Sequence, residues 1–255
     1  MMDTNTYLIA ADGPFLSKSL IAEASQNKCI IALDSAANQL ANRGFKPDII
    51  LGDLDFDDEK AAEQLWGIQK TSLQPYQGKN GVLIVPAKNK NYTDLEKAVH
   101  FCDQNNADAI HILCATGGRM DHDQTNIRLL EAAYSPDRSI FLHTAYQTLL
   151  FIRDQKQFII TGKEGDYCGI FGIPQAVMFC HYGLAYGTGK NYALYAGHDS
   201  SANQIVGSLG ACLDIQGSAL IAHPPMYEAQ RTFSAASYKE QLLILLNDLG
   251  NANTL

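Results

Sequence analysis

The chain has 255 residues, 46% of them hydrophobic and 18% charged, which is ordinary for a globular protein. Its 27 acidic and 19 basic residues give a net charge of −8, and no Lys/Arg cluster marks a surface for nucleic acid or an anionic membrane. The six cysteines show no CxxC pair. The N-terminus has no basic stretch, and its apolar run is too short for a signal peptide or a membrane span. We therefore expect free thiols, a cytoplasmic location, and neither a nucleic-acid nor a membrane partner.

Residues 1–146 alternate short apolar runs with amphipathic helical patterns. Such alternation predicts βαβ units and a parallel sheet that helices cover on both faces. A helix over 93–105 would place Leu95, Ala98, Val99 and Cys102 on one face, with Thr93 as its N-cap. Strands are expected at 6–12, 28–34, 48–53, 81–86, 109–116 and 139–145, and helices at 15–26, 36–44, 93–105 and 123–134.

Residues 147–255 have a different rhythm, with short β-like runs separated by Gly, Asp and Lys turns. This spacing indicates a β-sandwich or a small barrel. A helical pattern over 237–249 ends at Gly250. The fold class we predict is α/β, with an N-terminal parallel-sheet domain over 1–146 and a C-terminal β-sandwich domain with a terminal helix over 147–255.

Carboxylates follow the predicted strands, where ligands bind in open parallel sheets. The second strand ends at Asp34, and the run "IILGDLDFDD" places Asp53 and Asp55 after the third. A D-x-D at a strand end points two carboxylates in similar directions and suits Mg²⁺. A solvated acidic loop would have the same sequence pattern and is the alternative. Asp94, beside Thr93, offers a third carboxylate, whereas Thr93 and Glu96 are equally explained as a capping box.

The stretch "ATGGRMDHDQTN" after the fifth of these strands is the most informative. Gly117 and Gly118 allow the backbone to approach a phosphate closely, and Arg119 can grip phosphate oxygens in a bidentate fork. Asp121 either adds a metal ligand or orients a hydroxyl, and Asn126 lies on the following helix. The alternative is a tight turn followed by a surface arginine.

In sequence and order, the blocks "LDSAANQL", "PDIILGDLDF", "NYTDLEKAV" and "CATGGRMDHDQTNI" resemble the signature blocks of thiamin pyrophosphokinases. The likeness is good over 30–130 and looser in "SSANQIVG…ACLDIQGSALI". It implies an α/β domain followed by a β-sandwich, usually in a homodimer with sites formed between subunits. It also implies Mg²⁺-dependent transfer of a pyrophosphoryl group from ATP to the hydroxyl of thiamine, with release of AMP.

The resemblance also implies roles for individual residues. Metal and substrate hydroxyl would be held by four carboxylates, those of Asp53, Asp55, Asp94 and Asp121. ATP and the diphosphate would be lined by Asp34, Asn38, Thr93, Gly117, Gly118, Arg119 and Asn126. Thiamine would be gripped partly by Ser201 and Asn203.

The chain departs from the family pattern at four positions. Ser35, Phe56 and Ala202 stand where the family usually has Gly, Ser and Ser, and Asn91 replaces an Asp that would bind Mg²⁺ more strongly. These changes keep two alternatives open: a non-catalytic binder of nucleotide or thiamine, and a pyrophosphokinase with another hydroxylated acceptor. A phosphohydrolase of the haloacid dehalogenase type is a further alternative, although its D-x-D usually follows the first strand.

Overall fold

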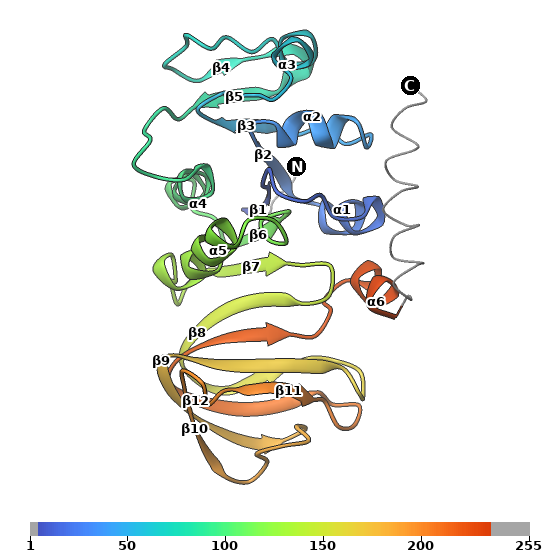
Figure 1. The fold of residues 1–255 in the computed structure, drawn as a ribbon, viewed down its shortest axis with the longest axis vertical. Helices are drawn as coiled ribbons and strands as arrows, with labels where there is room; N and C mark the ends of the chain where they lie inside the picture. The colour runs from blue at the N-terminus through green and yellow to red at the C-terminus, as the bar shows by residue number, and fades with distance from the viewer. Residues whose placement is uncertain (1–4, 236–255) are drawn as a thin grey trace.

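The computed structural model describes residues 5–235, and in it all strands belong to one sheet of mixed direction (Figure 1). Along the sheet the order is β10-β9-β12-β8-β7-β6-β1-β2-β3-β5-β4, with β11 paired to β9. The α/β fold with a strand-rich C-terminal part is as predicted. The division into two domains at 146/147 stays a prediction, because β7 and β8 are hydrogen-bonded across that point.

The N-terminal half supplies the parallel part of the sheet. Pairing of β1 with both β2 and β6 places β1 at the point where the strand order reverses. The short β4 (Tyr76–Gln77), which the sequence did not indicate, is the antiparallel edge beside β5. The parallel strands are β1 (Thr6–Ala10), β2 (Cys29–Leu33), β3 (Ile49–Gly52), β5 (Leu83–Pro86), β6 (Ala109–Leu113) and β7 (Ser139–His143).

Helices cover both faces of this parallel part, as the alternating pattern predicts. In Figure 1, α4 and α5 lie on one side of it and α1 and α2 on the other. The acidic residues after β3 begin a further helix, since the Asp58 carboxylate accepts a hydrogen bond from the Ala61 N–H at 3.0 Å. The helices are α1 (Lys18–Ala24), α2 (Ala36–Ala41), α3 (Glu59–Trp66), the 3₁₀ turn η1 (Lys79–Gly81), α4 (Asp94–Gln104), α5 (Met120–Ala132) and α6 (Glu228–Ala235).

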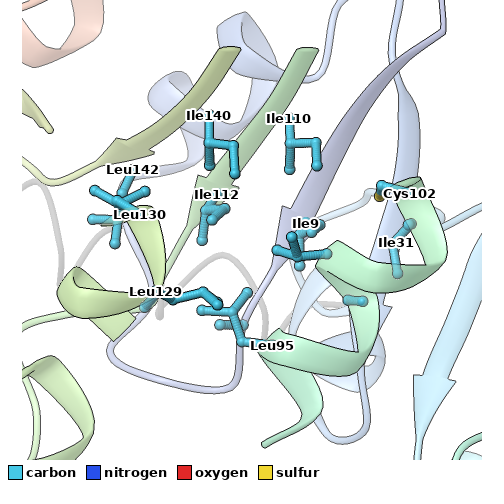
Figure 2. Packing of buried hydrophobic residues seen from close by; sticks show 14 of the residues in the cluster. Ile9, Ile31, Leu95, Cys102, Ile110, Ile112, Leu129, Leu130, Ile140 and Leu142 are labelled. Carbon is cyan, nitrogen blue, oxygen red and sulfur yellow. The ribbon is translucent and has the colours of Figure 1, made fainter. Parts of the chain in front are cut away.

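The hydrophobic core has a layer on each face of the parallel sheet. In the layer of Figure 2, strand residues such as Ile112 and Ile140 face α4 and α5, which contribute Leu95, Leu129 and Leu130. The face predicted for α4 is confirmed, because its four apolar members are all buried. The second layer, under α1, α2 and α3, contains Phe56 and Trp66.

Our expectation of short strands in the C-terminal half is wrong for β8 (Thr148–Ile160) and β9 (Tyr167–Tyr182), which are single strands of 13 and 16 residues. Turn-forming residues inside these strands mark β-bulges, where the register to β12 (Ala211–His223) shifts and the sheet bends. Side chains from both halves of the bent strands then share one core cluster. The remaining strands are β10 (Asn191–Tyr195) and β11 (Ser200–Gln204).

Three further expectations concern the whole chain. The six cysteines are all free thiols, as predicted. The helix expected at 237–249 lies outside the described residues. Within residues 5–235 no helix has both the length and the apolar character that crossing a membrane requires.

Candidate active site

A cavity of about 730 Å³ opens at the carboxyl edge of the parallel strands. The segments after β1, β2, β3 and β6 and the start of α4 all reach it, which is where this sheet type binds ligands. Most of the predicted site residues of the α/β half are among its lining. Its polar lining includes Asp12, Asp34, Asp55, Thr93, Asp94, Gly118, Arg119, Asp121 and Asn126.

Asp34 follows β2 in the left-handed backbone region at φ 40° and is 7% exposed. Its Oδ1 accepts a hydrogen bond from the Leu54 N–H at 2.9 Å, which fixes the carboxylate over the end of β3. A Cβ at Gly52 would stand 2.2 Å from that same oxygen. The glycine that interrupts the apolar run therefore makes room for Asp34.

The residue between the two aspartates of the D-x-D separates them. Leu54 has φ 65°, a conformation that non-glycine residues rarely adopt, and its side chain is 1% exposed in the core. Asp53 points toward Asp34 and Asp94, whereas the Asp55 side chain is 77% exposed and lies 3.7 Å from Lys70 Nζ. The expected pairing of Asp53 with Asp55 is thus replaced by a cluster from three different segments.

Carboxylate oxygens of Asp34, Asp53 and Asp94 lie within 4.8 Å of one another. Burial and the neighbouring carboxylates of Asp94 and Asp53 raise the pKa of Asp34 to about 8. A hard divalent cation such as Mg²⁺ fits this donor set, because it takes oxygen ligands and would offset the repulsion among the carboxylates. Asp55 and Asp121 lie outside the cluster, so metal binding by them stays a prediction.

Lysines balance part of this negative charge. Lys90 Nζ is 2.6 Å from Asp53 Oδ2, and the hydrogen bond from Lys90 is the main reason why the Asp53 pKa is lowered. Lys97 Nζ is 2.8 Å from Asp94 Oδ1, and Lys88 donates to the Asp53 carbonyl oxygen. Lysines of the chain therefore compensate the charge of Asp53 and Asp94 in part.

The start of α4 has the capping box predicted from the sequence. The Glu96 N–H donates to Thr93 Oγ1 at 3.2 Å, and the Thr93 N–H donates to Glu96 Oε2 at 2.6 Å. Because this box fixes the first turn of α4, it also fixes Asp94, the first residue of the helix. The capping and the functional interpretations of the segment are therefore compatible.

The glycine loop before α5 has its own internal bonds. The Gly117 and Gly118 N–H groups, expected to face a phosphate, donate to the Asp123 carboxylate at 2.9 and 3.4 Å. Arg119 forms a bidentate pair with Asp121, at 3.1 Å from Nε and 2.5 Å from Nη2, and this pair lowers the pKa of Asp121 to about 2. Phosphate binding here would exchange these partners.

Two predicted nucleotide-binding asparagines hold segments of the fold together. Asn126 donates to the Ala115 carbonyl at 2.8 Å, so α5 is tied to the end of β6. Asn38 accepts from Trp66 Nε1 at 3.0 Å and donates to the Asp58 carbonyl at 3.3 Å, and it is not part of the cavity lining. The structure therefore brings Asn126, but not Asn38, to the acidic cavity.

The two residues predicted to grip thiamine differ in exposure. Asn203 is 1% exposed, and its amide exchanges hydrogen bonds with both the N–H and the carbonyl of Tyr186, at 3.1 and 3.0 Å. Ser201, two residues earlier on β11, is exposed. Both lie far along the sheet from the acidic cavity.

We did not single out Asp12 and Lys90 from the sequence, and we assigned Asp34 to the nucleotide; that role stays a prediction, while the structure places Asp34 beside Asp53 and Asp94. Asp12 follows β1 and lines the cavity, where burial and then the charge of Asp57 raise its pKa to about 6. The rule that pointed to Asp34 and Asp53, a carboxylate at a strand end, applies equally to Asp12. No local pattern points to Lys90.

The departures at Ser35 and Phe56 have structural roles. Ser35 Oγ accepts a hydrogen bond from the Asp57 N–H at 2.8 Å, which joins the ends of β2 and β3. Phe56 is 5% exposed within the core layer under α3. Neither change removes a carboxylate from the cavity.

Residues 21–142 match the family described as the catalytic domain of thiamin pyrophosphokinase. The chain is also 31% identical over 145 residues to thiamine pyrophosphokinase 3 of Oryza sativa subsp. japonica. That similarity covers 52% of this chain and 49% of the rice protein, so the chain spans about half of the length of this relative.

Solved structures of such proteins share the fold. Thiamine pyrophosphokinase from Bacillus subtilis superposes with a TM-score of 0.71 at 21% identity, covering 87% of this chain and 100% of that one. For thiamin pyrophosphokinase from Candida albicans the TM-score is 0.69 at 18% identity, covering 86% and 88%. The D-x-D follows the third strand of this fold, not the first as expected for a dehalogenase-type phosphohydrolase. Over residues 21–142, which include Asp34, Asp53 and Asp94, the chain is therefore similar to thiamin pyrophosphokinase catalytic domains.

Proposed function

We propose that the chain is a thiamin pyrophosphokinase, which transfers a pyrophosphoryl group from ATP to the hydroxyl of thiamine with the help of Mg²⁺. The observation that carries this proposal is the meeting of Asp34, Asp53 and Asp94 within 4.8 Å, at a cavity that Asp34, Asp94 and Arg119 line. A site with carboxylates for a metal and a guanidinium for phosphate is suited to a polyphosphate substrate.

The reaction forms a bond between the acceptor oxygen and the β-phosphorus and breaks the bond from that phosphorus to the oxygen that leaves with AMP. When bound, Mg²⁺ neutralises phosphate charge, and in such transfers positioning and charge neutralisation supply most of the catalysis. The chain's part is to hold the metal by the three-carboxylate cluster and to orient the phosphates by Arg119. Asp55, Thr93, Asp121 and Asn126 line the same cavity.

We further propose that two copies of the chain form a homodimer and share the thiamine site. Strand β11 pairs with β9, and Asp34 follows β2. Six strand spacings separate β9 from β2, or about 29 Å along the sheet. Ser201 on β11 is therefore remote from the cavity of its own chain. Binding of one thiamine by both regions needs a second copy.

Product analysis tests the function. Purified protein is incubated with ATP and Mg²⁺, with and without thiamine, and the products are separated by chromatography. We expect AMP and thiamine diphosphate in equal amounts, and neither when EDTA removes the metal. Retained ATP binding without AMP would favour the non-catalytic alternative, and AMP formed only with another alcohol would identify a different acceptor.

The predicted cytoplasmic location is proposed on the six free thiols alone.

A further inference from the structure

Two lysines of one short segment contact Asp53. The segment is 87–93, which connects β5 to α4. Lys90 Nζ is 2.6 Å from Asp53 Oδ2, and Lys88 donates a hydrogen bond to the main-chain carbonyl of Asp53. The Lys90 side chain is 76% exposed, whereas that of Asp53 is 16% exposed. An exposed ammonium thus reaches inward to a carboxylate of the cluster.

The other lysine paired with the cluster is held differently. Lys97 Nζ is 2.8 Å from Asp94 Oδ1, its side chain is 11% exposed, and both residues stand on α4 three positions apart. The helix and the surrounding packing fix that pair. Lys90 belongs to no helix or strand, so its long side chain can change partner without any movement of the sheet or of α4.

Lys90 and a divalent cation need the same carboxylate. The ammonium lies 2.6 Å from Oδ2 of Asp53, one of the three carboxylates through which the cluster would hold a metal. Two cations side by side repel each other, so a metal bound by Asp53 must weaken or displace the contact with Lys90. A displaced Lys90 would remain near the cluster, where the charges of Asp55 and Asp94 also act on it.

We propose that Lys90 changes partner during the catalytic cycle, from Asp53 in the metal-free chain to a phosphate oxygen of the nucleotide once the metal is bound. This inference rests on the proposed function and adds a phosphate-binding residue to it. Arg119 is held by Asp121 in the same chain, so Lys90 is the cation that metal binding itself releases. Metal and nucleotide binding would then be coupled through one side chain.

The proposal predicts effects of opposite sign for loss of the Lys90 charge. Without its competitor, Mg²⁺ alone should bind the free protein more tightly, by about two- to fivefold, the strength of an exposed ion pair. Without its phosphate contact, a nucleotide with Mg²⁺ should bind more weakly, by about tenfold or more. A lysine that only braces the loop would not shift the two affinities in opposite directions.

Isothermal titration calorimetry tests this with Lys90→Met on the full chain. Mg²⁺ alone is titrated first, followed by α,β-methylene-ATP at saturating Mg²⁺, an analogue that cannot transfer its pyrophosphoryl group. Lys163→Met is the matched control, because Lys163 is also exposed, at 67%, and also lies near a carboxylate, 3.7 Å from Glu228. We expect tighter Mg²⁺ and weaker nucleotide for Lys90→Met only, and Lys90→Arg should keep most of the nucleotide affinity.

Any other result for Lys90→Met overturns the inference, including unchanged Mg²⁺ affinity, weaker Mg²⁺ binding or unchanged nucleotide affinity. The same shifts in Lys163→Met would also overturn it, because the effect would then be one of net charge. A wild-type chain that binds no Mg²⁺ refutes the proposed function as well. A wild-type chain that binds Mg²⁺ and forms AMP, with Lys90→Met indistinguishable from it, refutes the role of Lys90 alone.

Discussion

Two regions of the molecule contain polar side chains that the sequence marks as functional, and the structure treats them in opposite ways. At the carboxyl edge, the carboxyl groups of Asp34, Asp53 and Asp94 crowd together within 4.8 Å. On β11, the Asn203 amide is buried with its hydrogen-bonding capacity filled by Tyr186, Ser200 and Gln204. Groups whose needs are met inside the chain are suited to positioning backbone, whereas crowded carboxylates are suited to a cation.

The largest effect is expected for Asp53→Asn. Loss of one carboxylate of the cluster should lower turnover by about a thousandfold, because charge stabilisation is the main catalytic term. The free energy of unfolding without metal should change little, since solvent screens the largely exposed Lys90 in the lost ion pair. Turnover and thermal unfolding in EDTA measure the two quantities.

Asp137→Asn is the control, because Asp137 precedes β7 at the opposite edge of the sheet. It should leave turnover unchanged. If Asp53→Asn unfolds the protein or keeps near wild-type turnover, the carboxylates are structural and the two regions do not differ as described.

The second test concerns Asn203→Ala. Four hydrogen bonds disappear and buried backbone groups lose their partners, so the free energy of unfolding should fall by about 2–4 kcal/mol. Turnover per folded molecule should stay within a few-fold of wild type. Denaturant unfolding and steady-state kinetics give both numbers.

Ser201→Ala serves for comparison, because Ser201 is an exposed neighbour on the same strand. Its unfolding free energy should stay within about 0.5 kcal/mol of wild type. Should Asn203→Ala prove as stable as wild type but require far more thiamine for half-maximal rate, Asn203 would act on substrate in the way its resemblance to the family implies.

A third, smaller effect is a pH dependence of stability that distinguishes the edge from the rest of the chain. The folded-state pKa of Asp34 is raised from 3.8 to about 8, so between these values the folded chain binds more protons than the unfolded chain. The free energy of unfolding without metal should therefore fall as pH rises through this window. Asp34→Asn should lose this part of the slope and Asp137→Asn should retain it, as denaturant unfolding in EDTA at several pH values would show. Equal slopes for wild type and Asp34→Asn would contradict the repulsion inferred for the cluster.

The smallest expected effect belongs to Asn91→Asp, which restores a carboxylate that the resemblance leads us to expect. Placed one residue from Lys90, it should tighten Mg²⁺ binding by about two- to fivefold, as for an exposed charge pair. Calorimetric titration with Mg²⁺ measures this, with Asn106→Asp, just after α4 at the opposite edge, as the control. Equal Mg²⁺ affinities in wild type and Asn91→Asp would show that position 91 lies outside the influence of the site.

Much of the parallel half could be predicted from the sequence, since its strands and helices follow local periodicity and caps. The acidic edge could be predicted too, because carboxyl ends of parallel strands converge. The partners of Asp53 could not, because they depend on the left-handed conformation of Leu54 and on the space left by Gly52. These are tertiary constraints that a D-x-D spacing does not contain.

The antiparallel half was predicted less well for a related reason. Asp154 resembles a turn residue and Gln157 does not, yet both have positive φ and lie at bulges inside the single strand β8. Whether such a residue ends a strand or bends it is decided by pairing with β12, which is distant in sequence. Local composition therefore indicated the irregularity at Asp154, but neither the one at Gln157 nor the continuation of the strand.

Crystallography can show directly whether the carboxylates of the edge bind a metal. Crystals grown with Mn²⁺, an oxygen-binding substitute for Mg²⁺, would show the ion by its anomalous scattering. We predict a peak among the carboxylates of Asp34, Asp53 and Asp94, with the Lys90 ammonium moved away from Asp53. A cavity with no peak at saturating Mn²⁺, or an ion bound elsewhere, would contradict the account.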